Sequence, residues 1–193
     1  MKHPEIILLP VLMFTDYFLT VLGAIWREGK HSQHFKTGHY ELNPVWQKQI
    51  GEKKWFAPRH IALTVLVSAV LAGLIEYGDI PESLTQAVLG CAFVVFATVI
   101  GRHLSNLLTF RRLTRGAGEI TGEVTMSHSL TLSISMYQYL VVVLPLGIVA
   151  IFSPTPFVVG GLAGAVAVIL VHAVWLRRHR KAQAKEARRG AVD

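Results

Sequence analysis

Five long apolar stretches alternate with polar segments along the chain. They occupy residues 6–26, 61–75, 84–110, 130–152 and 157–176. A helix needs about 20 mostly apolar residues to cross a bilayer, so each stretch predicts a transmembrane helix. The sequence Ser-Pro-Thr-Pro at 153–156 separates the last two stretches and predicts a tight turn between antiparallel helices. The predicted fold class is therefore all-α, a polytopic membrane helix bundle.

A further helix is predicted on the membrane surface over residues 44–56. Asn43 and Pro44 form a typical helix start, with asparagine as the cap and proline at the first helical position. Aromatic residues, among them Trp46 and Trp55, are interspersed with charges in this segment. That mixture is typical of a helix that lies flat in the headgroup layer, so we expect an interfacial helix here.

The composition of the chain indicates lipid surroundings. Hydrophobic residues make up 52% of the sequence and charged residues 16%, whereas soluble domains carry about 25% charged residues. The single cysteine, Cys91, excludes a disulfide framework. The net charge is +7, but the basic residues flank the apolar stretches, which favours membrane lipids as partners and not nucleic acid. We predict one membrane-embedded domain over residues 1–176, followed by a basic tail over 177–193.

Basic residues gather in alternate connections. They occur between the first and second stretches, between the third and fourth, and after the fifth. The connection after the second stretch instead carries Glu76, Asp79 and Glu82, with no Lys or Arg. Because basic loops stay on the cytoplasmic side, five spans satisfy every connection. This predicts a multi-pass protein of a prokaryotic inner membrane, with its N-terminus outside and its C-terminus in the cytoplasm.

Two of the apolar stretches carry opposite charges at matching depths. Asp16 lies midway along the first stretch, with Thr20 one turn later on the same face. Arg102 lies in the third stretch, followed by His103 and, one turn on, by Asn106. A charge at that depth costs several kcal/mol unless it is paired, so we expect Asp16 and Arg102 to pair. The alternatives are an ion pair that only fixes helix packing, and an arginine that extends to the headgroups.

The fourth apolar stretch is polar at its cytoplasmic end. His128, Thr131, Ser135 and Gln138 follow one another at spacings of 3, 4 and 3, which places them in one stripe on a helix. Such a stripe is either hydrogen-bonding glue between helices or one wall of a water-filled vestibule. With Asp16 and Arg102 it predicts a polar pocket that faces the cytoplasm.

The histidines after the first stretch are the metal-ligand candidates of the chain. They are His31, His34 and His39. The sequence has no paired cysteines and no helical His-Glu motif to join them, so these histidines are interpreted as solvated. No metal and no cofactor is predicted.

Two short motifs carry a resemblance. The pattern Asp-x-x-x-Thr at Asp16 and Thr20, followed by Glu-x-Asn-Pro at Glu41, Asn43 and Pro44, resembles a family of small prokaryotic multi-span membrane proteins of unknown function. The match covers about the first quarter of the chain, and the link between the motifs is longer here and rich in His and Lys. The resemblance supplies no activity, and it implies that these residues act together. It adds Glu41 and Asn43 to the predicted pocket.

The fifth stretch carries Gly160 and Gly164, a pair of small residues four apart. Such a face lets helices approach closely, so it predicts packing within the bundle, between copies of the chain, or with a membrane partner.

Three functions remain open from the sequence. The first is transporter- or channel-like handling of a small ion or solute, with Asp16 as the charged site and Arg102, His103 and His128 as its partners. The second is a membrane-embedded enzyme that acts on a lipid or peptide at the cytoplasmic leaflet, with His103 or His128 as general base and Asp16 as its orienter. The third is an accessory subunit of a membrane complex. We favour the first over an enzyme, because no nucleophile motif or metal set is present.

Overall fold

The computed structural model describes residues 2–28, 35–37, 41–43, 45–115 and 122–189. Within these residues five helices are long and apolar enough to cross a membrane. The chain is therefore an integral multi-span membrane protein, and the all-α fold class is confirmed.

Each long helix covers one of the predicted apolar stretches. After a short 3-10 turn, η1, at Pro4–Ile7, the helices are α1 (Leu8–Glu28), α3 (Pro58–Tyr77), α4 (Glu82–Arg115), α5 (His128–Phe152) and α6 (Pro156–Arg189). Proline lies in the first turn of α3, where its missing N–H costs nothing. Ser127 caps α5, because its side chain accepts a hydrogen bond from the Leu130 amide at 3.2 Å.

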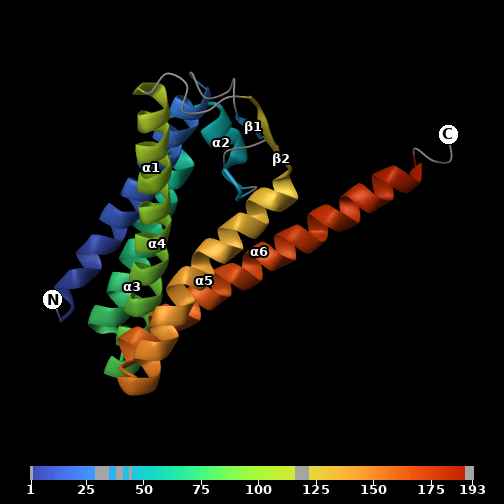
Figure 1. Ribbon diagram of the computed structural model, residues 1–193. Helices are drawn as coiled ribbons and strands as arrows, with labels where there is room; N and C mark the ends of the chain where they lie inside the picture. The colour runs from blue at the N-terminus through green and yellow to red at the C-terminus, as the bar shows by residue number, and fades with distance from the viewer. Residues whose placement is uncertain (1, 29–34, 38–40, 44, 116–121, 190–193) are drawn as a thin grey trace.

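Two helices extend well beyond the apolar stretches that predicted them. Both α4 and α6 have 34 residues, which corresponds to about 51 Å, whereas the hydrocarbon layer is about 30 Å thick. The extension of α6 carries the basic residues of the predicted tail as continuous helix to Arg189. Figure 1 shows α6 running beside α5 and leading the chain away from the other helices toward the C-terminus.

The α5–α6 hairpin predicted from the two prolines is present and packs on α4 through small residues. A Cβ added to Gly160 would lie 1.9 Å from the Ala87 carbonyl oxygen, and one added to Gly164 would lie 2.7 Å from Cys91 Sγ. Both glycines therefore face α4 within one chain, where only a residue without a side chain fits.

The surface helix is shorter than predicted. In place of a helix over 44–56, α2 covers Gln47–Gly51 and the chain then turns, with Lys53 in the left-handed region at φ 53°. The Tyr17 hydroxyl donates a hydrogen bond to the Lys54 carbonyl at 2.5 Å, so the segment is fixed to α1 after α2 ends. Buried Ile50 anchors α2 itself, in a cluster with residues of α1.

Two short strands were not predicted from the sequence. β1 (Phe35–Thr37) pairs in parallel with β2 (Val124–Met126), with Lys36 opposite Thr125. Three-residue strands carry too little periodicity to be recognised. The pairing joins the connection after α1 to the connection before α5, as Figure 1 shows at one end of the bundle. Glu41 follows β1 by four residues, so the strands position the segment that carries it.

Candidate functional site

A polar cluster lies between α1 and α4. Asp16 Oδ1 is 3.3 Å from His103 Nε2, and Thr20 Oγ1 is 3.0 Å from the same nitrogen. Thr20 is 4% exposed, and the Asp16 Oδ1 atom is buried without a hydrogen bond of good geometry. Asp16 and Thr20 meet His103 together because they are one helical turn apart on α1.

The direction of the hydrogen bonds in this cluster follows from Thr20. Its hydroxyl has one proton, which it donates to the Asp16 carbonyl oxygen at 2.8 Å. At the contact with His103 the hydroxyl oxygen must therefore accept, so His103 Nε2 carries a proton and donates it. Asp16 Oδ1 lies 3.3 Å from the same nitrogen, at ion-pair distance but without the geometry of a hydrogen bond.

Glu41 is brought to the same cluster from the segment between β1 and α2. Its Oε1 accepts a hydrogen bond from the Asn43 amide at 2.6 Å. Burial raises the pKa of the Glu41 carboxyl. The Asn43 amide lowers that pKa, the charge of Asp16 raises it, and His103 and Arg102 lower it to a smaller extent. Glu41 thus changes its charge closer to neutral pH than an ordinary glutamate does.

Arg102 lies beside this cluster but does not pair with Asp16. Its guanidinium carbon is 5.8 Å from the centroid of the Tyr139 ring, on α5. Among the residues that the structure describes, no carboxylate lies within ion-pair distance of it, and its buried Nε has no hydrogen-bond partner. A cation–π contact contributes about 0.5–2 kcal/mol, whereas an uncompensated buried charge costs several kcal/mol. The guanidinium is therefore under-compensated.

The predicted Asp16–Arg102 pair is thus replaced by an Asp16–His103 pair. Residues 102 and 103 differ by about 100° around the helix axis, so only one of them faces Asp16 directly. The alternative in which Arg102 extends to the headgroups is not observed either, because its guanidinium faces Tyr139, which is 1% exposed.

A second polar cluster lies between α5 and α6. His172 Nδ1 is 2.8 Å from the Val168 carbonyl, which can only accept, so this nitrogen carries the proton. In the neutral ring Nε2 then accepts a hydrogen bond from the Ser135 hydroxyl at 3.2 Å. Ser135 is 1% exposed and His172 8%. The Tyr139 ring lies 6.1 Å from the His172 ring and so joins this cluster to Arg102.

The other predicted site residues lie outside both clusters. His128 contacts His179 of α6, with ring centroids 5.0 Å apart, and Thr131 donates to the Ser127 carbonyl at 3.1 Å. Asn43 caps a turn by accepting from the Val45 amide at 3.1 Å, and Asn106 is half-buried one turn beyond Arg102 on α4. Gln138 is exposed. The structure therefore gathers Asp16, Thr20, Glu41, Arg102 and His103, and it separates the predicted stripe.

Two residues of the clusters were missed by the sequence analysis. Tyr139 lies one position after Gln138, and the buried face of α5 includes Leu132, Ser135 and Tyr139 at spacings of 3 and 4. A stripe read from Ser135 with a spacing of 4, in place of 3, would have included Tyr139. His172 interrupts an apolar run in α6, and a histidine at such depth is itself a signal of buried hydrogen bonding.

The metal candidates His31, His34 and His39 lie outside the described residues, as does Pro44 of the Glu-x-Asn-Pro motif. Within the described ranges, no group of three or more His, Cys, Asp or Glu side chains is arranged to hold a metal ion.

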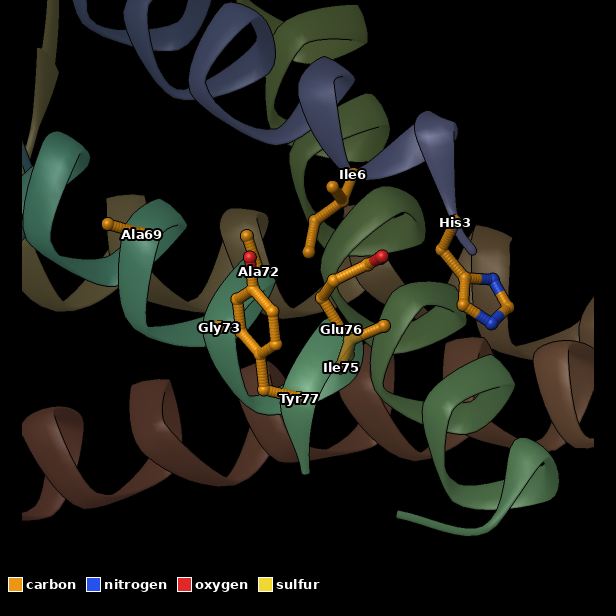
Figure 2. Close-up of a pocket in the computed structure, with 8 residues that line it drawn as sticks. All are labelled: His3, Ile6, Ala69, Ala72, Gly73, Ile75, Glu76 and Tyr77. Carbon is orange, nitrogen blue, oxygen red and sulfur yellow. The ribbon is translucent and has the colours of Figure 1, made fainter. Parts of the chain in front are cut away.

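A cavity of about 290 Å³ lies at the opposite end of the bundle (Figure 2). His3 and Ile6 of the N-terminal segment face α3, which contributes Ile75 and Glu76. His3 lies 2.8 Å from Glu5 and 3.0 Å from Glu82, and the Lys2 amide donates to Glu76 at 2.8 Å. The contact with Glu5 is the main cause that raises the pKa of His3. These polar groups pair with one another, so they fasten the N-terminus and leave a mostly apolar cavity.

Comparisons of this chain with protein-family models, with curated proteins and with solved structures found no match.

Proposed function

We propose that the chain is a transporter- or channel-like membrane protein that handles a small ion or solute together with protons at the Asp16–His103 cluster. The observation that carries the proposal is the contact of Asp16 with His103 between two apolar helices, with partly buried Glu41 electrostatically coupled to both. Chains of Asp, Glu and His within membrane spans are typical of proton relays in pumps and transporters.

The hydrogen-bond geometry favours this function over an enzyme. A general base with an orienting carboxylate binds the nucleophile at one ring nitrogen and the carboxylate at the other. Here Asp16 and Thr20 both approach His103 Nε2, and that nitrogen already carries a proton. His128, the other predicted base, contacts His179. An accessory role alone does not account for charge gathered at bilayer depth, because such charge is costly.

Proton-linked flux tests the proposed function. The purified protein is reconstituted in liposomes with an internal pH-sensitive dye, and an imposed pH gradient is followed while a panel of small inorganic and organic ions is added. We expect at least one ion to accelerate proton movement with the native protein and not with Asp16→Asn. Equal flux with both proteins, or no acceleration by any ion, would contradict the proposal.

We also propose that the chain lies in a prokaryotic inner membrane and that the basic end of the bundle faces the cytoplasm. The positive residues of α4 and α6 and of the segment around α2 support this orientation. In a Cys91→Ala background, Asp79→Cys should react with an impermeant maleimide in intact cells, and Lys185→Cys only after lysis. Labelling of Lys185→Cys in intact cells would overturn the orientation.

A further inference from the structure

The arginine of the site lacks the carboxylate that the sequence predicted for it. Asp16 is directed to His103, and Glu41 is bound to the Asn43 amide. Among the described residues, Arg102 has Tyr139 as its close neighbour and a buried Nε without a hydrogen bond. Within the part of the chain that the structure describes, the site therefore holds a cation without a carboxylate at ion-pair distance.

We infer that Arg102 and Tyr139 form a binding site for an oxyanion, a carboxylate or phosphate group that supplies the missing negative charge. This rests on the proposed function and names its substrate class. Guanidinium presents several N–H donors in a plane and binds carboxylate and phosphate oxygens in pairs, and the Tyr139 hydroxyl adds a donor from the facing helix. Asp16 and His103 lie next to this position and would take up the proton that accompanies the anion.

The geometry favours an anion over a metal cation as the species bound here. A cation beside Arg102 would be repelled by the guanidinium, and within the described residues the carboxylates and histidines do not converge as metal ligands. The basic residues of α4, including Arg111 and Arg112, lie two to three turns beyond Arg102 toward the basic end. Their charge raises the local concentration of anions at that end.

The inference is tested by titration calorimetry of the protein in neutral detergent, with inorganic phosphate and acetate as probes at fixed pH and fixed sodium chloride. We expect at least one probe to bind, and Arg102→Gln to weaken that binding about tenfold or more, because a charge-assisted hydrogen bond is lost. Tyr139→Phe should weaken it less. Arg112→Gln, on the same helix, is the matched control and should weaken binding far less than Arg102→Gln, because Arg112 acts only through its screened long-range charge.

A lipid headgroup carries the same phosphate chemistry, so nanodiscs separate the two sources. If the occupant is a lipid, nanodiscs that contain phosphatidylglycerol should reduce phosphate binding relative to phosphatidylcholine nanodiscs, and Arg102→Gln should abolish that difference. If the occupant is a free anion, both nanodiscs should give the same affinity.

The melting temperatures of the native protein and of Arg102→Gln give a second test. Without added anion, Arg102→Gln should be at least as stable as the native protein, because an under-compensated charge is removed. Phosphate should raise the melting temperature of the native protein and not that of the variant. Unfolding of Arg102→Gln would mean that the arginine is already compensated, and the inference would be wrong. Equal probe affinity in the native protein and Arg102→Gln would overturn it too.

These results separate the two proposals. Phosphate or acetate binding through Arg102 without ion-driven proton flux would leave the oxyanion site standing and reject the transport function. Proton flux driven by a cation and retained in Arg102→Gln would reject the oxyanion site alone.

Discussion

The bundle contains two buried polar regions, each built around a histidine, and they differ in how their hydrogen-bonding capacity is used. At His172 both ring nitrogens have a partner fixed by the helices, the Val168 carbonyl and the Ser135 hydroxyl. At His103 the surroundings include the carboxylates of Asp16 and Glu41 and the guanidinium of Arg102. The first region is neutral and complete, whereas the second has more charge than its contacts compensate.

The difference shows how to tell structure from function among polar groups in a membrane protein. Neutral groups that satisfy one another add stability and require nothing further. Charged groups that are only partly compensated reduce stability, and they are retained at sites where a bound ligand or proton supplies the missing compensation. The presence of a buried histidine is therefore less informative than the balance of charge and hydrogen bonds around it. We expect the His172 region to respond to mutation in stability and the His103 region to respond in function.

The largest effect is expected where α6, the helix of His172, packs on α4, the helix of His103. Gly160→Ala places a methyl group 1.9 Å from the Ala87 carbonyl oxygen, so α6 must move away from α4. We expect a loss of about 3 kcal/mol in the free energy of unfolding, at the upper end for overpacking, together with loss of function. Gly147→Ala is the control, because nothing lies within 4 Å of its added Cβ. Reversible denaturation in micelles measures both, and equal stabilities would contradict the α4–α6 packing.

A smaller loss is expected within the His172 region. Ser135→Ala leaves the Nε2 atom of buried His172 without its donor, which should cost about 1–3 kcal/mol. Ser133→Ala, two residues away, removes only a hydroxyl that donates to the Ser129 carbonyl, and it should change stability by less than about 0.5 kcal/mol. Proton flux in liposomes should persist in both. Loss of flux in Ser135→Ala with normal stability would move the functional site to α5 and α6.

At Asp16 we expect function and stability to separate. The contact with His103 at 3.3 Å is an ion-pair distance without good hydrogen-bond geometry, so its loss is offset by removal of a buried charge. Asp16→Asn should change the free energy of unfolding by less than about 1 kcal/mol while flux is abolished. A destabilisation of about 3–5 kcal/mol, as expected for breaking a buried pair, would mean that the pair is structural.

The smallest effect concerns the pH dependence of stability. The pKa of Glu41 in the folded protein is raised above the ordinary value of 4.5, so the folded protein binds a proton at this carboxyl more tightly than the unfolded chain does. Its favourable contribution is complete below pH 4.5 and is lost as the pH rises through the raised pKa. Melting temperatures measured against pH should show this decline in the native protein and not in Glu41→Gln. The same slope in both proteins would remove Glu41 from the cluster.

The sequence predicted the charged members of the site better than it predicted their partners. Asp16 and His103 are recognisable because polar groups in apolar stretches are costly, and Glu41 entered through its motif. Which residue faces Asp16 depends on helix rotation, and a step of about 100° exchanges Arg102 for His103. The same uncertainty in helix rotation explains why Gln138 was predicted to face the site, whereas the neighbouring Tyr139 is the buried residue. The β1–β2 pairing joins two three-residue segments that lie far apart in the sequence and have no periodic pattern, so it could not be predicted from local sequence.

Proton uptake on ligand addition shows whether the His103 region is the chemically active part of the bundle. Phosphate or acetate is added to lightly buffered micelles of the native protein, Asp16→Asn and Ser135→Ala, and the protons bound are counted from the pH change. We expect uptake with the native protein and with Ser135→Ala, and none with Asp16→Asn. Uptake that persists in Asp16→Asn, or that disappears in Ser135→Ala, would contradict it.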